Sequence, residues 1–419
     1  MKIIGKFFKK LGPGIITGSA DDDPSGIATY SQAGAQFSLK LLWTALFTLP
    51  LMVVVQEMCA RIGMVTGQGL AQTFKSIFSR RVLLGAVVLL FLANIFNIGA
   101  DFGIMASSIK LLLPSASLYF LIIAVAVISL LLEIFISYKT YFHILKWLCL
   151  ALFAYWLTAL LVVTDWGEIF KNTILPHLEW HGDYLMILVA FLGTTISPYL
   201  FFWQTSEEVE EEIGQGRTTI KERRGATKEE ISNMRRDTWM GMIFSNFTTF
   251  FIVVTTAETL FKNGLYNITS AAEAAMALRP LAGDLTYFLF TLGIIGVGLL
   301  AIPVLAGSAA YALAEIFNLR EGLFFKWRQA KGFYTIIGLA ILTGVLMNFI
   351  GLNPIRALIY AAVLNGLTAP VFIFMILKAA NSQKIMGQFT NSRLVNIFGW
   401  LTFIFMAGAG LAFLGSLVF

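Results

Sequence analysis

The chain has 419 residues, of which 58% are hydrophobic and only 13% are charged. A soluble domain of this length carries about twice that share of charged residues, so the composition excludes an ordinary soluble protein and predicts a membrane protein. The net charge of +6 then bears on membrane topology and not on nucleic acid. Cys59 and Cys149 both lie in apolar runs, which argues against a disulfide framework and against a cysteine-based metal site.

Apolar segments of about 20 residues, the length that crosses a bilayer, recur from one end of the chain to the other. We expect eleven membrane-spanning helices, at Gly14–Ala33, Leu41–Gly63, Val82–Leu113, Leu118–Ile136, Ile144–Val163, Tyr184–Thr205, Trp239–Leu260, Leu285–Ala314, Phe333–Ile350, Ile355–Leu377 and Val395–Phe419. The N-terminus is expected in the cytoplasm and the C-terminus outside, because most of the Lys and Arg residues then lie on the cytoplasmic side. We expect an integral protein of a prokaryotic inner (plasma) membrane.

A single transmembrane domain is expected to fill residues 1–419. We expect it to be divided into a cytoplasmic tail at 1–13, a first repeat at 14–163, a second repeat at 184–377 and an extra C-terminal helix at 395–419. The second repeat contains a polar cytoplasmic loop at 206–237 whose charges are mixed in sign. Such mixing is typical of a solvated helix or hairpin, and a regulatory or metal-sensing loop is the alternative.

Two of the expected spans are interrupted near their middle. The first contains three consecutive aspartates, residues 21–23, followed by Pro-Ser-Gly, and the sixth contains Gly193 and Pro198. Glycine and proline disrupt the helical hydrogen-bond ladder, and unwound backbone is tolerated at membrane depth only where it lines protein or water. Broken first and sixth spans predict an all-α fold with an inverted five-plus-five repeat and a binding site between the breaks. A simple proline kink at Pro198 is the alternative.

Three stretches of the chain resemble the natural resistance-associated macrophage protein (NRAMP) family. They are GPGIITGSADDDPSGIATYSQAGA around the first break, QEMCARIGMVTGQGLA at residues 56–71, and GTTISPYLFFWQTS at residues 193–206. The resemblance implies the LeuT-like fold of proton-coupled importers of divalent transition metals. In that family an aspartate, an asparagine, a methionine and backbone carbonyls hold the ion. These ligands fall here on Asp23, Gly26, Ser197, and the carbonyls of Ala20 and Thr194.

The exchange of methionine for Ser197 changes the chemistry that the resemblance implies. A thioether favours transition metals, whereas carboxylates, hydroxyls, carbonyls and water suit Mg²⁺ and Mn²⁺. We therefore expect a secondary transporter of a hard divalent cation that works by alternating access, with Asp23 as the metal ligand. A branch of NRAMP-related magnesium transporters shows the same kind of methionine loss. The residues expected to bind the cation are Asp23, Asp22, Ala20, Ser25, Gly26, Thr194 and Ser197. The alternative for Asp23 is that it only caps the following half-helix and does not bind the cation. Asp21 is treated as a structural partner.

Three further residues are candidates for a proton pathway. Asp101 aligns with a glutamate that conducts protons in the family, Asn97 stands near the position of the family's aspartate, and Glu57 is an acid within an expected span. Glu57 also lies four residues before Arg61, a spacing that predicts an ion pair. For Asp101 the alternative is a structural hydrogen bond. No cofactor is expected apart from the transported cation and possible H⁺ coupling.

Other functions compete with cation transport. A transporter of a small organic solute or anion on the same fold, with the aspartates as a cation or proton coupling site, is the main rival. A membrane enzyme is disfavoured because the sequence lacks a nucleophile elbow, a phosphate loop and a histidine cluster, and GIIGVG at 293–298 has the character of a packing face. His177 and His181 flank Glu179 at a metal-like spacing without further ligands. The expected partners are the bilayer and the divalent ion, with no nucleic acid and no obligatory protein partner.

Overall fold

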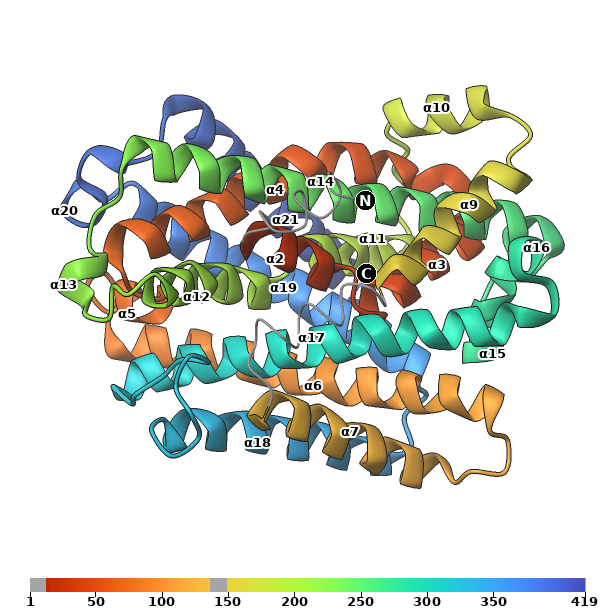
Figure 1. Ribbon diagram of the computed structural model, residues 1–419. Coiled ribbons are helices and arrows are strands. Elements are labelled where there is room, and N and C mark those ends of the chain that lie inside the picture. The colour runs from red at the N-terminus through yellow and green to blue at the C-terminus, as the bar shows by residue number, and fades with distance from the viewer. Residues whose placement is uncertain (1–12, 136–148, 419) are drawn as a thin grey trace, which may run out of the picture.

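The structure is a computed structural model that describes residues 13–135 and 149–418, and these residues form helices and no strand. Figure 1 shows long helices running side by side, with α6, α7, α17 and α18 packed together along one side of the bundle. The longer helices are α2 (Pro13–Asp21), α3 (Pro24–Phe37), α4 (Leu42–Thr66), α6 (Arg80–Leu112), α7 (Leu118–Phe135), α9 (Phe153–Val162), α10 (Trp166–Ile174), α11 (Gly182–Thr195), α12 (Pro198–Gly214), α14 (Lys228–Thr259), α17 (Thr286–Phe317), α18 (Lys331–Met347), α19 (Pro354–Ala380) and α21 (Arg393–Ser416).

Nine helices in the described part of the chain are long and apolar enough to cross a membrane. The difference from the eleven expected spans has two causes. The first of the nine, Pro24–Thr66, runs through α3 and α4 and so contains the second half of the first expected span and all of the second. The expected fifth span begins within residues 136–148, outside the described residues, and only its end is seen as α9. Most of the expected tail, residues 1–12, and the final residue also lie outside the described residues.

Both broken helices are present at the expected places. The first is divided into α2 and α3, with two residues between Asp21 and Pro24, and the sixth into α11 and α12, with two residues between Thr195 and Pro198. In each case a proline begins the second half-helix, where its missing N–H has no helical partner to lose. The same local chemistry therefore interrupts both spans.

Glycines hold each first half-helix against a neighbouring helix. A Cβ atom at Gly18 of α2 would lie 2.2 Å from the carbonyl oxygen of Gly241 in α14. A Cβ atom at Gly193 of α11 would lie 2.1 Å from the carbonyl oxygen of Ala362 in α19. Neither helix pair could approach so closely with larger residues, so these glycines position both breaks against the surrounding bundle.

The polar segment at 206–237 is largely helical. Helix α12 continues to Gly214, a short helix α13 covers Ile220–Arg223, and α14 begins at Lys228, eleven residues before the expected start of that span at Trp239. Thr227 and Glu230 form a capping box at the start of α14, which stabilises the helix in its polar first turns.

The packing face expected at residues 293–298 is also present. The run 293–298 lies inside α17, and a Cβ atom at Gly298 would lie 2.4 Å from the Met105 sulfur of α6, so this glycine serves helix packing. Cys59 is a buried free cysteine.

Candidate functional site

Asp23 lies in the gap of the first broken helix and caps its second half. Its Oδ1 accepts hydrogen bonds from the Gly26 N–H at 2.7 Å and from the Ser25 hydroxyl at 2.5 Å. Pro24 follows directly and occupies the first position of α3. The local sequence Asp-Pro-Ser-Gly therefore fixes this carboxylate at a helix N-terminus, where the helix dipole favours negative charge.

The second oxygen of Asp23 faces two other helices. Asn97 of α6 donates its amide N–H to Oδ2 at 3.0 Å, and the Tyr199 hydroxyl of α12 donates to the same oxygen at 3.3 Å. The Tyr199 hydroxyl also lies 3.5 Å from the carbonyl oxygen of Ala20. Asp23 is thus held by groups from three helices and is completely buried. Asn97, which sequence reasoning placed in the proton pathway, is in direct contact with the main expected ligand.

The two breaks meet at Gly26 and Thr194. A Cβ atom at Gly26 would lie 3.2 Å from the methyl carbon of Thr194 and 3.3 Å from the carbonyl oxygen of Asp21. The missing side chain at Gly26 therefore lets the start of α3 approach the end of α11. At the position where the family carries an asparagine, this chain has a close contact between half-helices.

The hydroxyls at the second break are bonded to the backbone. The Ser197 hydroxyl oxygen lies 2.6 Å from the carbonyl oxygen of Gly193 and 2.7 Å from that of Thr194. The Thr194 hydroxyl donates to the carbonyl oxygen of Ala190 at 3.0 Å. A hydroxyl that donates its hydrogen in this way keeps its lone pairs for a cation. Thr194 and Ser197 are therefore oxygen donors at the break, and their role as ligands stays a prediction.

Asp21 and Asp22 lie beside α14, whereas Asp23 contacts Asn97 of α6. The Ser245 hydroxyl of α14 is hydrogen bonded to Oδ2 of Asp21 and lies 3.4 Å from Oδ1 of Asp22. Asp21 Oδ1 and Asp22 Oδ2 are buried without a hydrogen-bond partner. Asp22, expected to bind the cation with Asp23, contacts the same α14 hydroxyl as Asp21, and its role as a ligand stays a prediction.

The polar residues of α6 divide among different neighbours. Asn94 donates to the Leu305 carbonyl at 2.9 Å and to the Ser308 hydroxyl at 2.8 Å, both in α17. Asp101 is completely buried, and neither of its carboxylate oxygens has a hydrogen-bond partner. The structural hydrogen bond considered for Asp101 is therefore not formed, while Asn94 does make such a bond.

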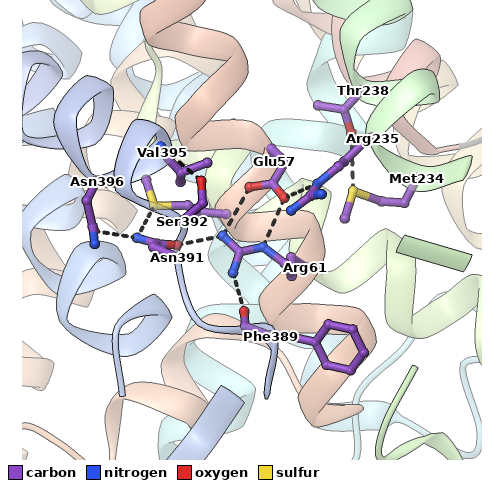
Figure 2. A network of polar contacts seen from close by, with 11 residues as sticks. Glu57, Arg61, Met234, Arg235, Thr238, Phe389, Asn391, Ser392, Val395 and Asn396 are labelled. Atoms are coloured by element: carbon purple, nitrogen blue, oxygen red, sulfur yellow. Dashed lines mark hydrogen bonds and ion pairs between the residues drawn. The ribbon is translucent and has the colours of Figure 1, made fainter. Parts of the chain in front are cut away.

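Glu57 lies in a network of charged and polar groups that is separate from Asp23. Figure 2 shows its carboxylate between two arginines: Arg61 contacts both oxygens, at 2.9 and 3.1 Å, and Arg235 of α14 contacts Oε1 at 2.8 Å. Arg61 also donates to the carbonyl oxygen of Phe389 and to the side chain of Asn391. The predicted ion pair with Arg61 is confirmed, and it joins α4 to α14 and to the segment before α21. A part for Glu57 in proton coupling stays a prediction.

The two histidines before α11 converge on one carboxylate. His177 and His181 place their Nε2 atoms 3.1 and 2.7 Å from the two oxygens of Glu179, which also pairs with Lys40. The hydrogen bond from Lys40, with help from the histidines, lowers the pKa of Glu179 to about 2. Because Lys40 supplies the countercharge, this cluster is explained as a surface ion-pair network.

Four buried carboxylates without basic partners define the chemistry of the breaks. Asp21, Asp22, Asp23 and Asp101 have no exposed surface, and none takes part in any ion pair between described residues. Burying an unpaired charge costs several kcal/mol, so a cation or protons must compensate. The described residues contain no group of three His, Cys, Asp or Glu side chains arranged to hold a metal. A bound cation would therefore complete its shell with hydroxyls, carbonyls and water.

Sequence reasoning missed three residues that the structure brings to this region. Tyr199 follows the proline of the second break, and Ser245 begins a polar run with Asn246, Thr248 and Thr249 inside a largely apolar span, so both had a visible signal. Asn365 of α19 is 1% exposed, with both amide atoms unpartnered. It precedes a glycine that packs on α11, and its sequence context alone gave no indication of a role.

Comparison with known proteins gives a consistent result over the whole chain. A sequence model described as "Natural resistance-associated macrophage protein-like" matches residues 14–416. The divalent metal cation transporter MntH of Clostridium acetobutylicum is 24% identical over 418 aligned residues, which cover 94% of this chain and 87% of that protein.

Solved structures share the fold at low sequence identity. A crystal structure of the Eremococcus coleocola manganese transporter, in complex with an aromatic bis-isothiourea substituted compound, is similar with a TM-score of 0.77 and 19% identity, covering 98% of this chain and 88% of that one. Mhp1, a nucleobase-cation-symport-1 family transporter in a closed conformation with bromovinylhydantoin bound, is similar with a TM-score of 0.56 and 13% identity, covering 97% and 90%. The expected all-α fold with its broken helices is confirmed.

Proposed function

Because the chain belongs to the natural resistance-associated macrophage protein (NRAMP) family, we propose that this integral membrane protein is a secondary transporter of a hard divalent cation, Mg²⁺ or Mn²⁺. The family consists of metal ion transporters and not of enzymes. The observation that carries the proposal is the set of buried, unpaired carboxylates at the first break, which require a positive charge from outside the protein.

The donor chemistry supports a hard ion. Asp23 contributes a carboxylate, and Thr194 and Ser197 contribute hydroxyls. Ala20, the residue before the last of α2, contributes a backbone carbonyl that lies 3.5 Å from the Tyr199 hydroxyl. All of these atoms are oxygens, and the position of the family's methionine is Ser197. Oxygen shells suit Mg²⁺ and Mn²⁺, whereas the soft thioether that favours softer ions is missing.

The arrangement of half-helices supports an alternating-access cycle. The C-terminal ends of α2 and α11 carry partial negative charge and lie next to the two breaks, where they attract a cation. Asp23 and Ser197 are fully buried, as in a state closed to both sides of the membrane. We place the N-terminus in the cytoplasm and the C-terminus outside on the charge distribution of the loops. We place the protein in a prokaryotic plasma membrane because relatives such as MntH of Clostridium acetobutylicum are bacterial.

Proton coupling is assigned to fewer residues than the sequence suggested. We assign Asn97 to the cation site, since it donates to Asp23, and we retain Asp101 as the candidate for coupling because it is buried and unpartnered. Glu57, held by two arginines, is a weaker candidate.

The proposal is tested by flux into proteoliposomes that contain a trapped Mg²⁺-sensitive dye. We expect Mg²⁺ entry into vesicles with the wild-type protein and none with Asp23→Ala. The matched control is Asp284→Asn, which alters an exposed aspartate far from the breaks in sequence and should transport normally. Absence of Mg²⁺ and Mn²⁺ flux through folded wild-type protein would overturn the proposal in favour of an organic solute or anion.

A further inference from the structure

Asp21 and Asp22, called here the aspartate pair, are not needed for the tasks that Asp23 performs. Asp23 alone caps α3 and contacts α6 and α12. The aspartate pair contacts α14, where the Ser245 hydroxyl is the shared hydrogen-bonding group. One hydroxyl carries one hydrogen, so it can donate fully to only one of two carboxylates.

The aspartate pair therefore has unused acceptor capacity in a fully buried place. Both residues are 0% exposed, and one oxygen of each has no partner. No ion pair between described residues includes either carboxylate. A purely structural tie between α2 and α14 would need only one carboxylate, as the acceptor for Ser245. The second carboxylate would then add a buried, uncompensated negative charge, which costs free energy of folding.

The neighbouring groups are oxygen donors. The Thr248 hydroxyl, one turn after Phe244 in α14, is hydrogen bonded to Asp22 and also lies 3.1 Å from the Phe244 carbonyl oxygen, so its single hydrogen is shared between two acceptors and its lone pairs stay available. Asp21 is the last residue of α2, where the helix dipole adds partial negative charge. Two carboxylates, two hydroxyls and a helix C-terminus form the kind of environment that hard divalent cations prefer.

We infer that the aspartate pair and Ser245 form a second binding station for the same hard divalent cation, distinct from the station at Asp23. This inference rests on the proposed function. It assigns the three consecutive aspartates to two places: Asp23 to the junction of α3, α6 and α12, and the aspartate pair to the junction of α2 and α14.

The position of the second station gives it a place in the transport cycle. It lies at one end of a tight seam between α2 and α14, along which Gly18 packs on Gly241 and the Gly14 N–H donates to the Asp237 carboxylate at 2.6 Å. In the described arrangement this seam is closed. Separation of α2 from α14 would expose the aspartate pair to the side where α2 begins, while Asp23 stays among the other helices. The cation would then leave or enter through the second station.

The test measures Mn²⁺ binding to the purified full-length protein by electron paramagnetic resonance of the free ion. Asp23→Asn is expected to keep saturable Mn²⁺ binding, which disappears when Asp21→Asn and Asp22→Asn are added. The double variant Asp21→Asn/Asp22→Asn is expected to bind Mn²⁺ through Asp23 and to lose at least about tenfold in uptake rate, equal to about 1.4 kcal/mol. Asp284→Asn is the control for loss of one acidic charge at the surface.

A milder pair of variants keeps the test valid if the multiple changes prevent folding. In the Asp23→Asn background, Ser245→Ala should weaken the residual Mn²⁺ binding severalfold, and Ser245→Thr, which keeps the hydroxyl, should restore it. The inference is overturned if folded Asp23→Asn protein binds no Mn²⁺ while the wild type does, or if the aspartate-pair variant transports at the wild-type rate. A wild type that neither binds nor transports Mn²⁺ or Mg²⁺ would instead refute the proposed function itself.

Discussion

Two arginines share the Glu57 carboxylate but differ in burial, and this difference predicts unequal costs of removal. The side chain of Arg61 is 1% exposed, whereas that of Arg235 is 48% exposed. Replacing Arg61 by Leu leaves the buried Glu57 carboxylate with only the half-exposed Arg235 as a basic partner among the described residues, and it removes the donor to Phe389 and Asn391. Breaking a buried pair costs about 3–5 kcal/mol when the remaining charge is left alone, and Arg235 keeps the cost of Arg61→Leu at the lower end of that range. Losing an exposed partner costs about 0–1 kcal/mol.

The assay is unfolding in mixed micelles titrated with SDS and followed by tryptophan fluorescence. We expect Arg61→Leu to lower the free energy of unfolding by several kcal/mol and Arg235→Leu to lower it by less than about 1 kcal/mol. Arg61→Lys keeps the charge but loses the planar fork that contacts both oxygens of Glu57, so its cost should lie between the two. Because neither arginine contacts Asp23, the affinity for Mg²⁺ should be unchanged in the variants that fold.

Equal costs for Arg61→Leu and Arg235→Leu would refute the reasoning, because burial would then not set the strength of the network. A second result would also contradict it. If Glu57→Gln left stability unchanged but altered the pH dependence of uptake, Glu57 would act in proton coupling and not in holding α4 to α14.

Three shorter predictions follow from other contacts. Gly26→Ala should overpack the junction of the breaks, which lowers the free energy of unfolding by about 1–3 kcal/mol and slows uptake. Thr194→Ser should recover part of the loss, since it removes the methyl carbon 3.2 Å away. Full additivity of the two changes would count against this contact. Ser197→Met should shift uptake toward Cd²⁺, and an unchanged ion preference in competition flux would show that Ser197 does not touch the ion. At pH values above 4.5, Glu179→Gln should lower the melting temperature by a small amount, because the pairing with Lys40 stabilises only the charged carboxylate. The difference from the wild type should shrink as the pH falls toward the lowered pKa of about 2. A difference that grows on acidification would contradict that assignment.

The breaks were predictable from sequence because their cause is local. Proline and glycine act on their own backbone, so Pro24 and Pro198 mark the half-helix starts directly. Helix ends that depend on capping were predicted less well. The start of α14 was placed at Trp239 from hydropathy, although the helix begins eleven residues earlier, at Lys228. Thr227 and Glu230 form a capping box there, a signal that the sequence does contain.

The neighbours of the aspartates could not be derived in the same way. Which helix faces a given carboxylate depends on packing between segments far apart in the chain, and Ser245 lies more than 200 residues after Asp21 and Asp22. The resemblance placed Asp23, Gly26 and Thr194 in one site, and the structure brings them together. It gave no indication that Asn97 would donate to Asp23 or that the aspartate pair would face α14.

The preference for a hard cation is tested most directly by the ratio of Mg²⁺ to Cd²⁺ uptake. Both rates are measured for the wild-type protein in matched proteoliposomes, with Asp23→Ala vesicles as the background. An all-oxygen site without a thioether predicts Mg²⁺ entry that depends on Asp23 and exceeds Cd²⁺ entry. Cd²⁺ entry that depends on Asp23 while Mg²⁺ is excluded would contradict the account, because the site would then have kept a preference for soft ions without its methionine.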